Sequence, residues 1–325
     1  MSLIDQIDFA NHDGVNRAMI NDFMRNQFYD NIFVDRVQGQ HCIDIGFGTG
    51  LLSMLAIKHG AESIVAYESD SARYELGQTI IKRLGLEQKI QLIHSRFDHT
   101  MLDQYPTVTV VFSETVNGNL WQEGLFNSLP RKRKINFLPG KYFLEIYACV
   151  VPDSFAQGLI TPHINTGFNP GVDIDLNFVD VVNKIGFPGN TITNTAPQAE
   201  LNMLDPGVDT EWGWIPYLRL CVNNGQLVAG YYLDANDVSI KFVDDITVPV
   251  DFDQHNIQLV VNTTLWRNNS VILVPRVGMS HGDHCLMLDT GHWGPTLDPV
   301  ILYRPTSDVK IDHSFYSGLI TYTND

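Results

Sequence analysis

Two glutamates, Glu114 and Glu123, lie nine positions apart in the segment SETVNGNLWQEG, residues 113–124. The segment follows VTVVF, a mostly apolar run that predicts a buried strand, and it contains no lysine or arginine that could neutralise the carboxylates. Either both glutamates are ordinary surface acids, or they bind a cation that comes from outside the chain. A guanidinium suits the second interpretation, because it is planar, stays protonated and presents five N–H donors to two converging carboxylates.

A glycine-rich turn forms a second candidate site. The segment DIGFGTG, residues 44–50, lies between a predicted strand and a predicted helix. Such a turn lets the backbone approach a ligand closely and brings the helix N-terminus beside it. Dinucleotide-binding folds share this feature, but the spacing G-x-G-x-G favours S-adenosylmethionine. Glu68 closes the next predicted strand, 18 residues after Gly50, where an acceptor for the ribose hydroxyls is expected.

A third cluster is the segment HGDHCLMLDTGH, residues 281–292, which gathers three histidines, two aspartates and one cysteine. Histidine and cysteine are common zinc ligands, so the cluster raises the question of a metal site. Its spacing fits no standard zinc motif, and we therefore predict no metal.

The composition is that of a folded, acidic protein. Of the 325 residues 44% are hydrophobic and 18% charged, and the formal net charge is −16. An acidic surface repels a phosphate backbone, so we predict no nucleic-acid partner, whereas it suits cationic substrates.

Cysteine usage and hydropathy indicate the cellular compartment. The four cysteines stand far apart in the sequence, as is typical of free thiols in a reducing compartment. The first residues lack the apolar stretch of a secretory signal, and no apolar run reaches the roughly 20 residues that span a membrane. We expect a cytoplasmic protein without a membrane partner.

Strands and helices alternate over the first half of the chain. HCIDIGFG, SIVAYESD, KIQLIHS and VTVVFSE predict strands, and TGLLSMLAIKHGA and ARYELGQTIIKRLGL predict helices, the second of which ends at Gly85. This order implies a parallel sheet with its ligand site at the carboxyl ends of the strands. Residues 14–33 precede the sheet and predict an amphipathic helix. Its apolar positions at helical spacing are Val15, Met19, Ile20, Phe23 and Met24.

After about residue 140 the pattern changes to short strand-like runs separated by Gly, Asn, Asp and Pro. These runs are KYFLEIYACVV, WIPYLRLCVN, QLVAGYYLD, VSIKFVD, IQLVVNTTLW, SVILVPRV, HCLMLD and VILYRP. They predict an antiparallel barrel or sandwich. The predicted fold class is α/β plus all-β: a Rossmann-like parallel-sheet domain followed by an antiparallel β-barrel-like domain. The predicted boundaries are 1–37 for the helical segment, 38–140 for the Rossmann-like domain and 141–325 for the barrel, with 160–215 as a dimerisation arm or long excursion.

Several of these segments resemble motifs of the protein arginine methyltransferase family. DIGFGTGLLSMLA is similar to the first cofactor motif of the family, YESD to its ribose-binding segment, and SETVNGNLWQEG to its double-E loop, with both glutamates at the family's separation. FLPGK is similar to the segment that leads into the family's barrel, and Gly291-His292-Trp293 to its THW loop. GVNRAMIND followed by FMR resembles the N-terminal helix that covers the cofactor. The resemblance extends over residues 14–150 and returns around 285–305.

The resemblance implies a role for each matching residue in a site for S-adenosylmethionine. Arg25 would pair with the methionine carboxylate, and Glu68 would accept hydrogen bonds from the ribose hydroxyls. Asp98 would contact the adenine amino group. Met19 matches a methionine beside the sulfonium, although it equally fits a core position of an amphipathic helix. The remaining predicted cofactor positions are Asp44, Gly46, Gly48 and Gly50.

The same resemblance implies the substrate site. Glu114 and Glu123 would hold the guanidinium and draw its charge away from the attacking nitrogen. His292 would pair with Asp22 and pin the N-terminal helix against the barrel, and Trp293 would wall the arginine slot.

The implied activity is transfer of a methyl group from S-adenosylmethionine to a guanidinium nitrogen of an arginine in a protein or peptide, with S-adenosylhomocysteine as product. Holding the reactants in line would supply most of the catalysis. Two alternatives stay open: a methyltransferase that acts on a small amine or guanidino metabolite, and an inactive binding scaffold of the same fold. The resemblance also implies a homodimer.

Overall fold

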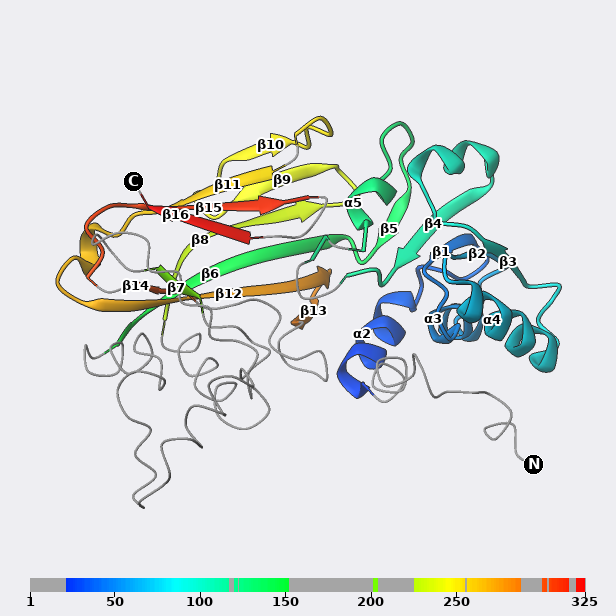
Figure 1. Ribbon diagram of the computed structural model, residues 1–325. Coiled ribbons are helices and arrows are strands. Elements are labelled where there is room, and N and C mark those ends of the chain that lie inside the picture. The colour runs from blue at the N-terminus through cyan, green and yellow to red at the C-terminus, as the bar shows by residue number, and fades with distance from the viewer. Residues whose placement is uncertain are drawn as a thin grey trace, which may run out of the picture.

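The computed structural model has an α/β part and a β part, drawn at the right and the left of Figure 1. It describes residues 22–116, 120–121, 123–151, 201–203, 225–254, 256–287, 300–302, 304–315 and 320–324. The two parts confirm the predicted fold class, a Rossmann-like domain followed by an antiparallel β domain.

The α/β part is built on a parallel sheet of five strands in the order β3-β2-β1-β4-β5. The two central strands are buried along most of their length, as is usual for a sheet that is covered on both faces. The strand order reverses between β1 and β4, and ligands of such sheets bind beyond the carboxyl ends at this point. The strands are β1 (His41–Ile45), β2 (Ser63–Glu68), β3 (Ile90–His94), β4 (Val108–Ser113) and β5 (Asn136–Leu138).

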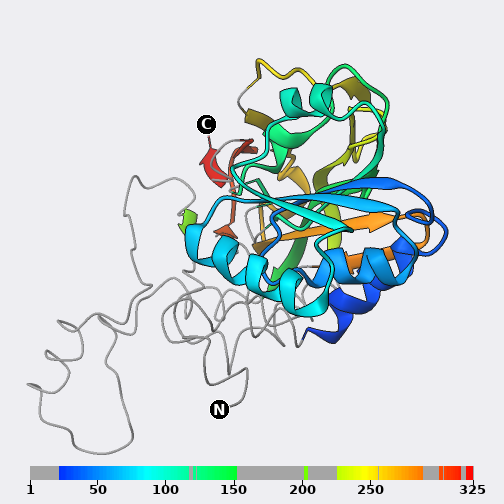
Figure 2. The same ribbon diagram turned by 90° about the vertical axis from the view of Figure 1, so that its right-hand side faces the viewer.

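Helices α2 (Phe23–Phe33), α3 (Leu51–Lys58) and α4 (Ser71–Leu84) lie along the same side of this sheet (Figure 2). Helix α4 begins where the Asp70 carboxylate accepts a hydrogen bond from the Arg73 backbone, at 2.9 Å. It ends at Gly85, which adopts the left-handed conformation with φ +66°, as the glycine predicts. Two further short helices are η2 (His99–Gln104) and α5 (Leu125–Ser128).

The part of α2 that the structure describes buries a different set of residues from the one the sequence pattern suggests. Phe23 and Met24 are 71% and 57% exposed, although they belong to the predicted apolar stripe. The buried face consists of Arg25, Phe28, Tyr29, Ile32 and Phe33. Tyr29 explains the difference, since its hydroxyl donates to the Ser113 carbonyl at the end of β4 and orients the helix on the sheet.

The β part contains an antiparallel sheet in the order β10-β9-β8-β6-β12-β14-β7, with β13 paired to β12, and a second antiparallel sheet in the order β11-β15-β16. Its longest strands, β6 (Lys141–Val151) and β12 (Ser270–His281), pair from Lys141 to Val151. The others are β7 (Leu201–Met203), β8 (Gln226–Asp234), β9 (Ser239–Phe242), β10 (Thr247–Pro249), β11 (Asn256–Val261), β13 (His284–Met287), β14 (Val300–Leu302), β15 (Val309–Ser314) and β16 (Ile320–Asn324), with a 3-10 turn, η3 (Thr264–Trp266).

Two predicted elements lie largely outside the described residues. These are the strand WIPYLRLCVN and the arm at residues 160–215, of which the structure describes β7 alone, paired to β14. Conversely, β15 and β16 were not predicted. Across the described residues, no helix is both long and apolar enough to cross a bilayer.

Candidate active site

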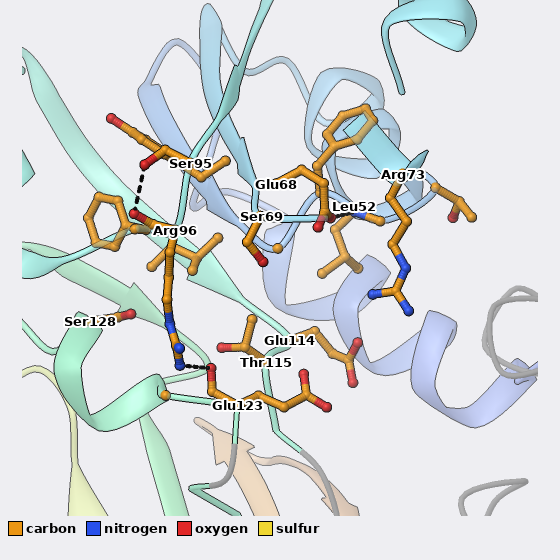
Figure 3. A pocket seen from close by; sticks show the side chains of 18 of the residues that line it. Leu52, Glu68, Ser69, Arg73, Ser95, Arg96, Glu114, Thr115, Glu123 and Ser128 are labelled. Carbon is orange, nitrogen blue, oxygen red and sulfur yellow. Dashed lines mark hydrogen bonds between the residues drawn. The ribbon is translucent and has the colours of Figure 1, made fainter. Parts of the chain in front are cut away.

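A cavity of about 430 Å³ lies at the carboxyl ends of β1, β2 and β4, where the strand order reverses (Figure 3). Three carboxylates and three guanidinium groups line it, so the cavity is strongly polar. The lining residues are Arg25, Ile45, Gly46, Phe47, Gly48, Thr49, Leu51, Leu52, Tyr67, Glu68, Ser69, Arg73, Ser95, Arg96, Phe97, Glu114, Thr115, Glu123, Gly124 and Ser128.

Glu114 follows directly after β4 and forms a buried ion pair with Arg25 of α2. The distance from Arg25 Nη2 to Glu114 Oε2 is 2.7 Å, and the two side chains are 5% and 3% exposed. Arg25 Nη1 donates to the Asn26 side-chain oxygen, so the guanidinium is fixed at two of its nitrogens. The family resemblance implies different ligands for these two residues, and the structure brings them into direct contact.

The buried position of this pair changes the ionisation of both groups. Burial raises the pKa of Glu114 to about 7, although the charge of Arg25 acts in the opposite direction. Burial lowers the pKa of Arg25, but the charge and hydrogen bond of Glu114, together with Tyr29 and Asp22, outweigh that effect and leave the pKa raised. Arg25 therefore stays cationic, and Glu114 is the group whose charge responds to pH near neutrality.

Glu123 extends into the same pocket from the turn before α5 (Figure 3). Partial removal from water raises the pKa of its carboxyl, an effect that Arg73 opposes. Its backbone carbonyl accepts a hydrogen bond from Arg96 Nη2 at 3.1 Å. Two carboxylates thus reach one cavity from the two ends of the loop, as a bound cation would require.

The glycine turn is joined to Glu68 by a backbone hydrogen bond. Gly48 N donates to Glu68 Oε2 at 2.8 Å, and Asp70 N donates to Oε1 at 2.9 Å, so both carboxylate oxygens are oriented. Gly46 has φ +83°, and a Cβ there would lie 2.7 Å from Thr115 Cγ2. The turn therefore needs glycine at position 46, both for its backbone conformation and for its approach to the loop that begins with Glu114.

Asp44 lies in β1, just before this turn, and its carboxylate joins the strand to helix α3, which follows the turn. Its Oδ2 accepts a hydrogen bond from Ser53 Oγ at 2.6 Å, and burial raises its pKa to about 7. It does not line the cavity.

Three buried polar atoms around the cavity lack hydrogen-bonding partners within the described part of the chain. They are Arg25 Nε, Glu114 Oε1 and Asp44 Oδ1. Buried polar groups are nearly always paired, and two of these atoms, Arg25 Nε and Glu114 Oε1, belong to residues that line the cavity and so indicate a ligand there. The donor suits a ligand carboxylate and Glu114 Oε1 suits a cation, so these residues fit an amino-acid-bearing cofactor beside a guanidinium.

The structure brings together most of the predicted site residues that it describes. Arg25, Gly46, Gly48, Glu68, Glu114 and Glu123 line one cavity. Asp22 instead begins α2, where its Oδ1 accepts from Arg25 N at 3.0 Å. Asp98 begins η2, binds Thr100 and does not line the cavity. Gly50 begins α3 behind the turn. Met19, His292 and Trp293 lie outside the described residues.

Arg73 and Arg96 line the cavity, although they belong to none of the motifs in the sequence. Arg73 lies in the first turn of α4, five residues after the end of β2, and Arg96 lies two residues after β3. Their positions just beyond the carboxyl ends of parallel strands were the available signal.

Comparison with known proteins shows partial sequence similarity and a shared fold. No protein-family model matches the chain. It is 30% identical over 164 residues to protein arginine N-methyltransferase 9 of Xenopus laevis, and this alignment covers 47% of this chain and 20% of that protein. It is 28% identical over 121 residues to protein arginine N-methyltransferase 1 of Saccharomyces cerevisiae, and this alignment covers 36% of this chain and 34% of that protein. The matches thus span between about a fifth and a third of the length of these relatives.

The fold is similar to solved structures over nearly the whole chain. The crystal structure of PRMT6 aligns with a TM-score of 0.58 and 15% identity, covering 96% of this chain and 99% of that one. A Trypanosoma brucei PRMT1 enzyme–prozyme heterotetrameric complex with AdoHcy aligns with a TM-score of 0.51 and 15% identity, over 97% and 93% of the two chains.

The parallel sheet, the site at its switch point and the attached antiparallel domain define a Rossmann-like methyltransferase fold with a β-barrel-type second domain. Within that class, the chain is similar in sequence to protein arginine N-methyltransferases over 47% and 36% of its length, and it shares the fold of PRMT6.

Proposed function

We propose that the protein transfers a methyl group to a guanidinium nitrogen of an arginine in a protein or peptide. The observation that carries the proposal is the state of Glu114. One of its oxygens is held by Arg25, while the other is buried without a partner in the described chain, in the cavity that Glu123 also enters. The similarity to protein arginine methyltransferases supports the same assignment.

The residues of the cavity divide into two groups by the ligand that they suit. Arg25, through its unpaired Nε, would bind the methionine carboxylate of S-adenosylmethionine, and Glu68 its ribose hydroxyls. Gly46 and Gly48 line the cavity at the turn where the cofactor would lie, and Asp44 supports that turn. When bound there, the cofactor supplies an electrophilic methyl group.

Glu114 and Glu123 would hold the guanidinium by charge-assisted hydrogen bonds. Because their positions are set before the substrate arrives, they align the attacking nitrogen without further reorganisation. Arg25 contributes indirectly: it keeps Glu114 oriented and favours its ionised form.

A second candidate substrate is a small guanidino compound that carries its own carboxylate. Arg73 and Arg96 line the same cavity as the two glutamates, so cations and anions lie within one site. The relative transfer to a peptide and to free arginine distinguishes this candidate from the first.

The experiment that tests the proposal combines calorimetry and labelled methyl transfer in one preparation. S-Adenosylmethionine and S-adenosylhomocysteine are titrated first. Labelled cofactor is then supplied with an Arg/Gly-rich peptide, with the same peptide carrying lysine in place of arginine, and with free arginine. Label on the arginine peptide alone supports protein arginine methylation, and label on free arginine alone supports the second candidate. Binding without transfer, or no binding, contradicts the proposed activity.

Two matched variants separate the roles of the ion pair. Glu114→Gln should lower methyl transfer by about 100-fold or more, because it removes a charge that is fixed for the transition state, and should leave cofactor affinity near that of the wild type. Arg25→Ala should instead weaken cofactor affinity by about tenfold or more, because a hydrogen bond to a charged group is lost. Normal turnover in Glu114→Gln, or unchanged cofactor affinity in Arg25→Ala, would reject the respective role. Arg36→Ala, an exposed change just beyond α2, serves as the control.

A further inference from the structure

A chain of three buried side chains connects the loop that carries Glu123 to both antiparallel sheets. Trp121 Nε1 donates to Tyr231 Oη at 2.6 Å, and Tyr231 Oη lies 2.9 Å from His313 Nδ1. Trp121 belongs to the loop after β4, Tyr231 to β8 and His313 to β15. All three side chains are fully buried.

One hydrogen bond in this chain has a fixed direction. An indole nitrogen can only donate, so the Tyr231 oxygen accepts from Trp121. The direction of the second bond depends on the imidazole tautomer, because the tyrosine hydroxyl can donate to His313 Nδ1 or accept from it. In either case the Tyr231 oxygen bonds both neighbours at once, and this restricts where the indole can lie.

Aromatic packing restricts the plane of the Trp121 ring as well. Its edge meets Phe126 at a centroid distance of 6.0 Å and Phe315 at 5.5 Å. Phe126 and Phe315 stack on each other at 4.3 Å with an interplanar angle of 6°. Phe126 comes from α5 and Phe315 follows β15, so the rings that hold Trp121 again come from both domains.

The loop backbone on both sides of Trp121 adopts conformations that need support from their surroundings. Leu120 has φ +61°, which is unfavourable for a residue with a side chain, and Gly124 has φ +86°. A backbone of this kind persists when surrounding contacts determine it. Trp121, adjacent to Leu120, is the buried contact best placed to do so.

The direction of the Glu123 carboxylate depends on this backbone. In the part of the chain that the structure describes, the carboxylate has no hydrogen-bonding partner of its own, and Figure 3 shows it extending into the cavity. The anchors of the loop are therefore Arg96, which binds the Glu123 carbonyl on the exposed side, and Trp121, two residues earlier, on the buried side.

We propose that Trp121, Tyr231 and His313 are positioning residues, through which the β domain sets the direction of Glu123 in the guanidinium site. This inference rests on the proposed function. It assigns the antiparallel domain a part in the geometry of the catalytic loop.

The test compares two tyrosines that are neighbours on β8. Tyr231→Phe removes the acceptor of Trp121 and the hydrogen bond to His313. Tyr232→Phe is the matched control, because its hydroxyl donates to Glu145 Oε1 at 2.6 Å, away from the loop. We expect Tyr231→Phe to lower kcat/KM for the guanidinium substrate roughly 10- to 100-fold, as a small misplacement of a catalytic group does, with unchanged cofactor affinity. Tyr232→Phe should match the wild type. A folded Tyr231→Phe with normal kcat/KM would overturn the proposal.

A second variant covers the case in which Tyr231→Phe does not fold. Trp121→Phe removes the indole N–H and keeps an aromatic ring, and it should show the same loss of kcat/KM. If the chain acts as a unit, the double variant should lose no more than either single variant. Normal kcat/KM in Trp121→Phe, or fully additive losses in the double variant, would overturn the proposal.

A readout that is independent of activity separates this inference from the proposed function. Carbon-13 NMR of the Glu123 carboxyl, assigned with Glu123→Gln, reports its pKa directly. The raised pKa should fall toward the ordinary value of a glutamate in Tyr231→Phe, where the loop relaxes toward water, and should persist in Tyr232→Phe. If the wild type transfers no methyl group, the proposed function fails, and a shift of this pKa in Tyr231→Phe alone still supports the positioning of Glu123. An unmoved pKa in that variant contradicts it.

Discussion

Arg25 and Glu114 are 89 positions apart in the chain, yet they form a buried hydrogen-bonded pair in the cavity. Removing one partner of such a pair leaves an uncompensated buried charge, at a typical cost of about 3–5 kcal/mol. The pair is not fully satisfied internally, since Arg25 Nε and Glu114 Oε1 have no partner among the described residues. At the scale of single residues, this incomplete pairing is what distinguishes a binding site from a structural ion pair.

The pH dependence of activity follows from the ionisation of Glu114. Burial raises the pKa of this carboxyl to about 7, and only the ionised form can accept hydrogen bonds from a guanidinium at both oxygens. Below that pKa the carboxyl is protonated and the site is impaired, so kcat/KM should rise as the pH increases from about 6 to about 8. The measurement is kcat/KM for the guanidinium substrate at saturating cofactor.

Replacing Arg25 provides a check on this assignment. Arg25 lowers the pKa of Glu114, so Arg25→Gln should move the rise in kcat/KM to higher pH. Arg25→Lys keeps the positive charge and should move it less. A flat profile across neutral pH, or the same profile in all three proteins, would show that another group controls the reaction.

At the scale of elements, the glycine turn and the double-E loop are packed against each other. Gly46 lies against Thr115, which follows Glu114 directly. Gly48 meets Glu68 through a backbone hydrogen bond. A change in the turn should therefore reach the substrate site as well as the cofactor site.

Gly46→Ala tests this contact. The left-handed backbone conformation should make the alanine unfavourable by about 1–2 kcal/mol, and its Cβ should also displace Thr115. Gly39→Ala is the control, because Gly39 has φ +67° but open space where the Cβ would lie. We expect both variants to lose stability in chemical denaturation, and Gly46→Ala alone to lose methyl transfer. Equal activity in the two variants would contradict the coupling of the turn to the loop.

At the scale of the whole molecule, a few hydrogen bonds tie the β part to the edge of the parallel sheet. The Asn236 side chain accepts from Phe137 N at 2.7 Å and donates to Phe137 O at 3.3 Å, so it caps edge strand β5 from the turn between β8 and β9. His281 Nδ1 accepts from Gly140 N at 3.1 Å, next to the start of β6. These contacts hold the junction where the chain passes from one domain to the other.

Asn236→Ala should weaken this junction. It leaves a buried backbone N–H without its partner, which should lower the free energy of unfolding by about 1–3 kcal/mol. It should also separate the unfolding of the two domains, measured by denaturation with probes in each. Asn262→Ala removes a comparable bond within one exposed turn, to Thr264 N, and should cost less. Equal effects of the two variants would argue against a coupling role for Asn236.

A homodimer is a prediction at the same scale, and it follows from the resemblance to the protein arginine methyltransferase family. If it is right, light scattering should give twice the monomer mass of 36.6 kDa. The monomer mass over a wide range of concentrations would contradict the proposal.

Much of the α/β part follows from local features of the sequence. Alternating apolar segments predict the strands and helices, Gly85 ends α4, and the glycine turn locates the cavity at the end of β1. These signals act over a few residues, because backbone conformation, capping and burial of one face are local consequences of side-chain type.

Contacts between distant segments could not be predicted in this way. The Arg25–Glu114 pair and the hydrogen bonds of Tyr231 join segments that are remote in the sequence. Strand β15 was missed because a polar residue, His313, occupies one of the buried positions of its alternating pattern. The buried polar groups in these contacts are tolerated because a partner from another element satisfies them. The partner that each buried polar group finds depends on how the two domains pack. The sequence therefore predicts which residues form the site, whereas the tertiary structure decides which of them pair with each other.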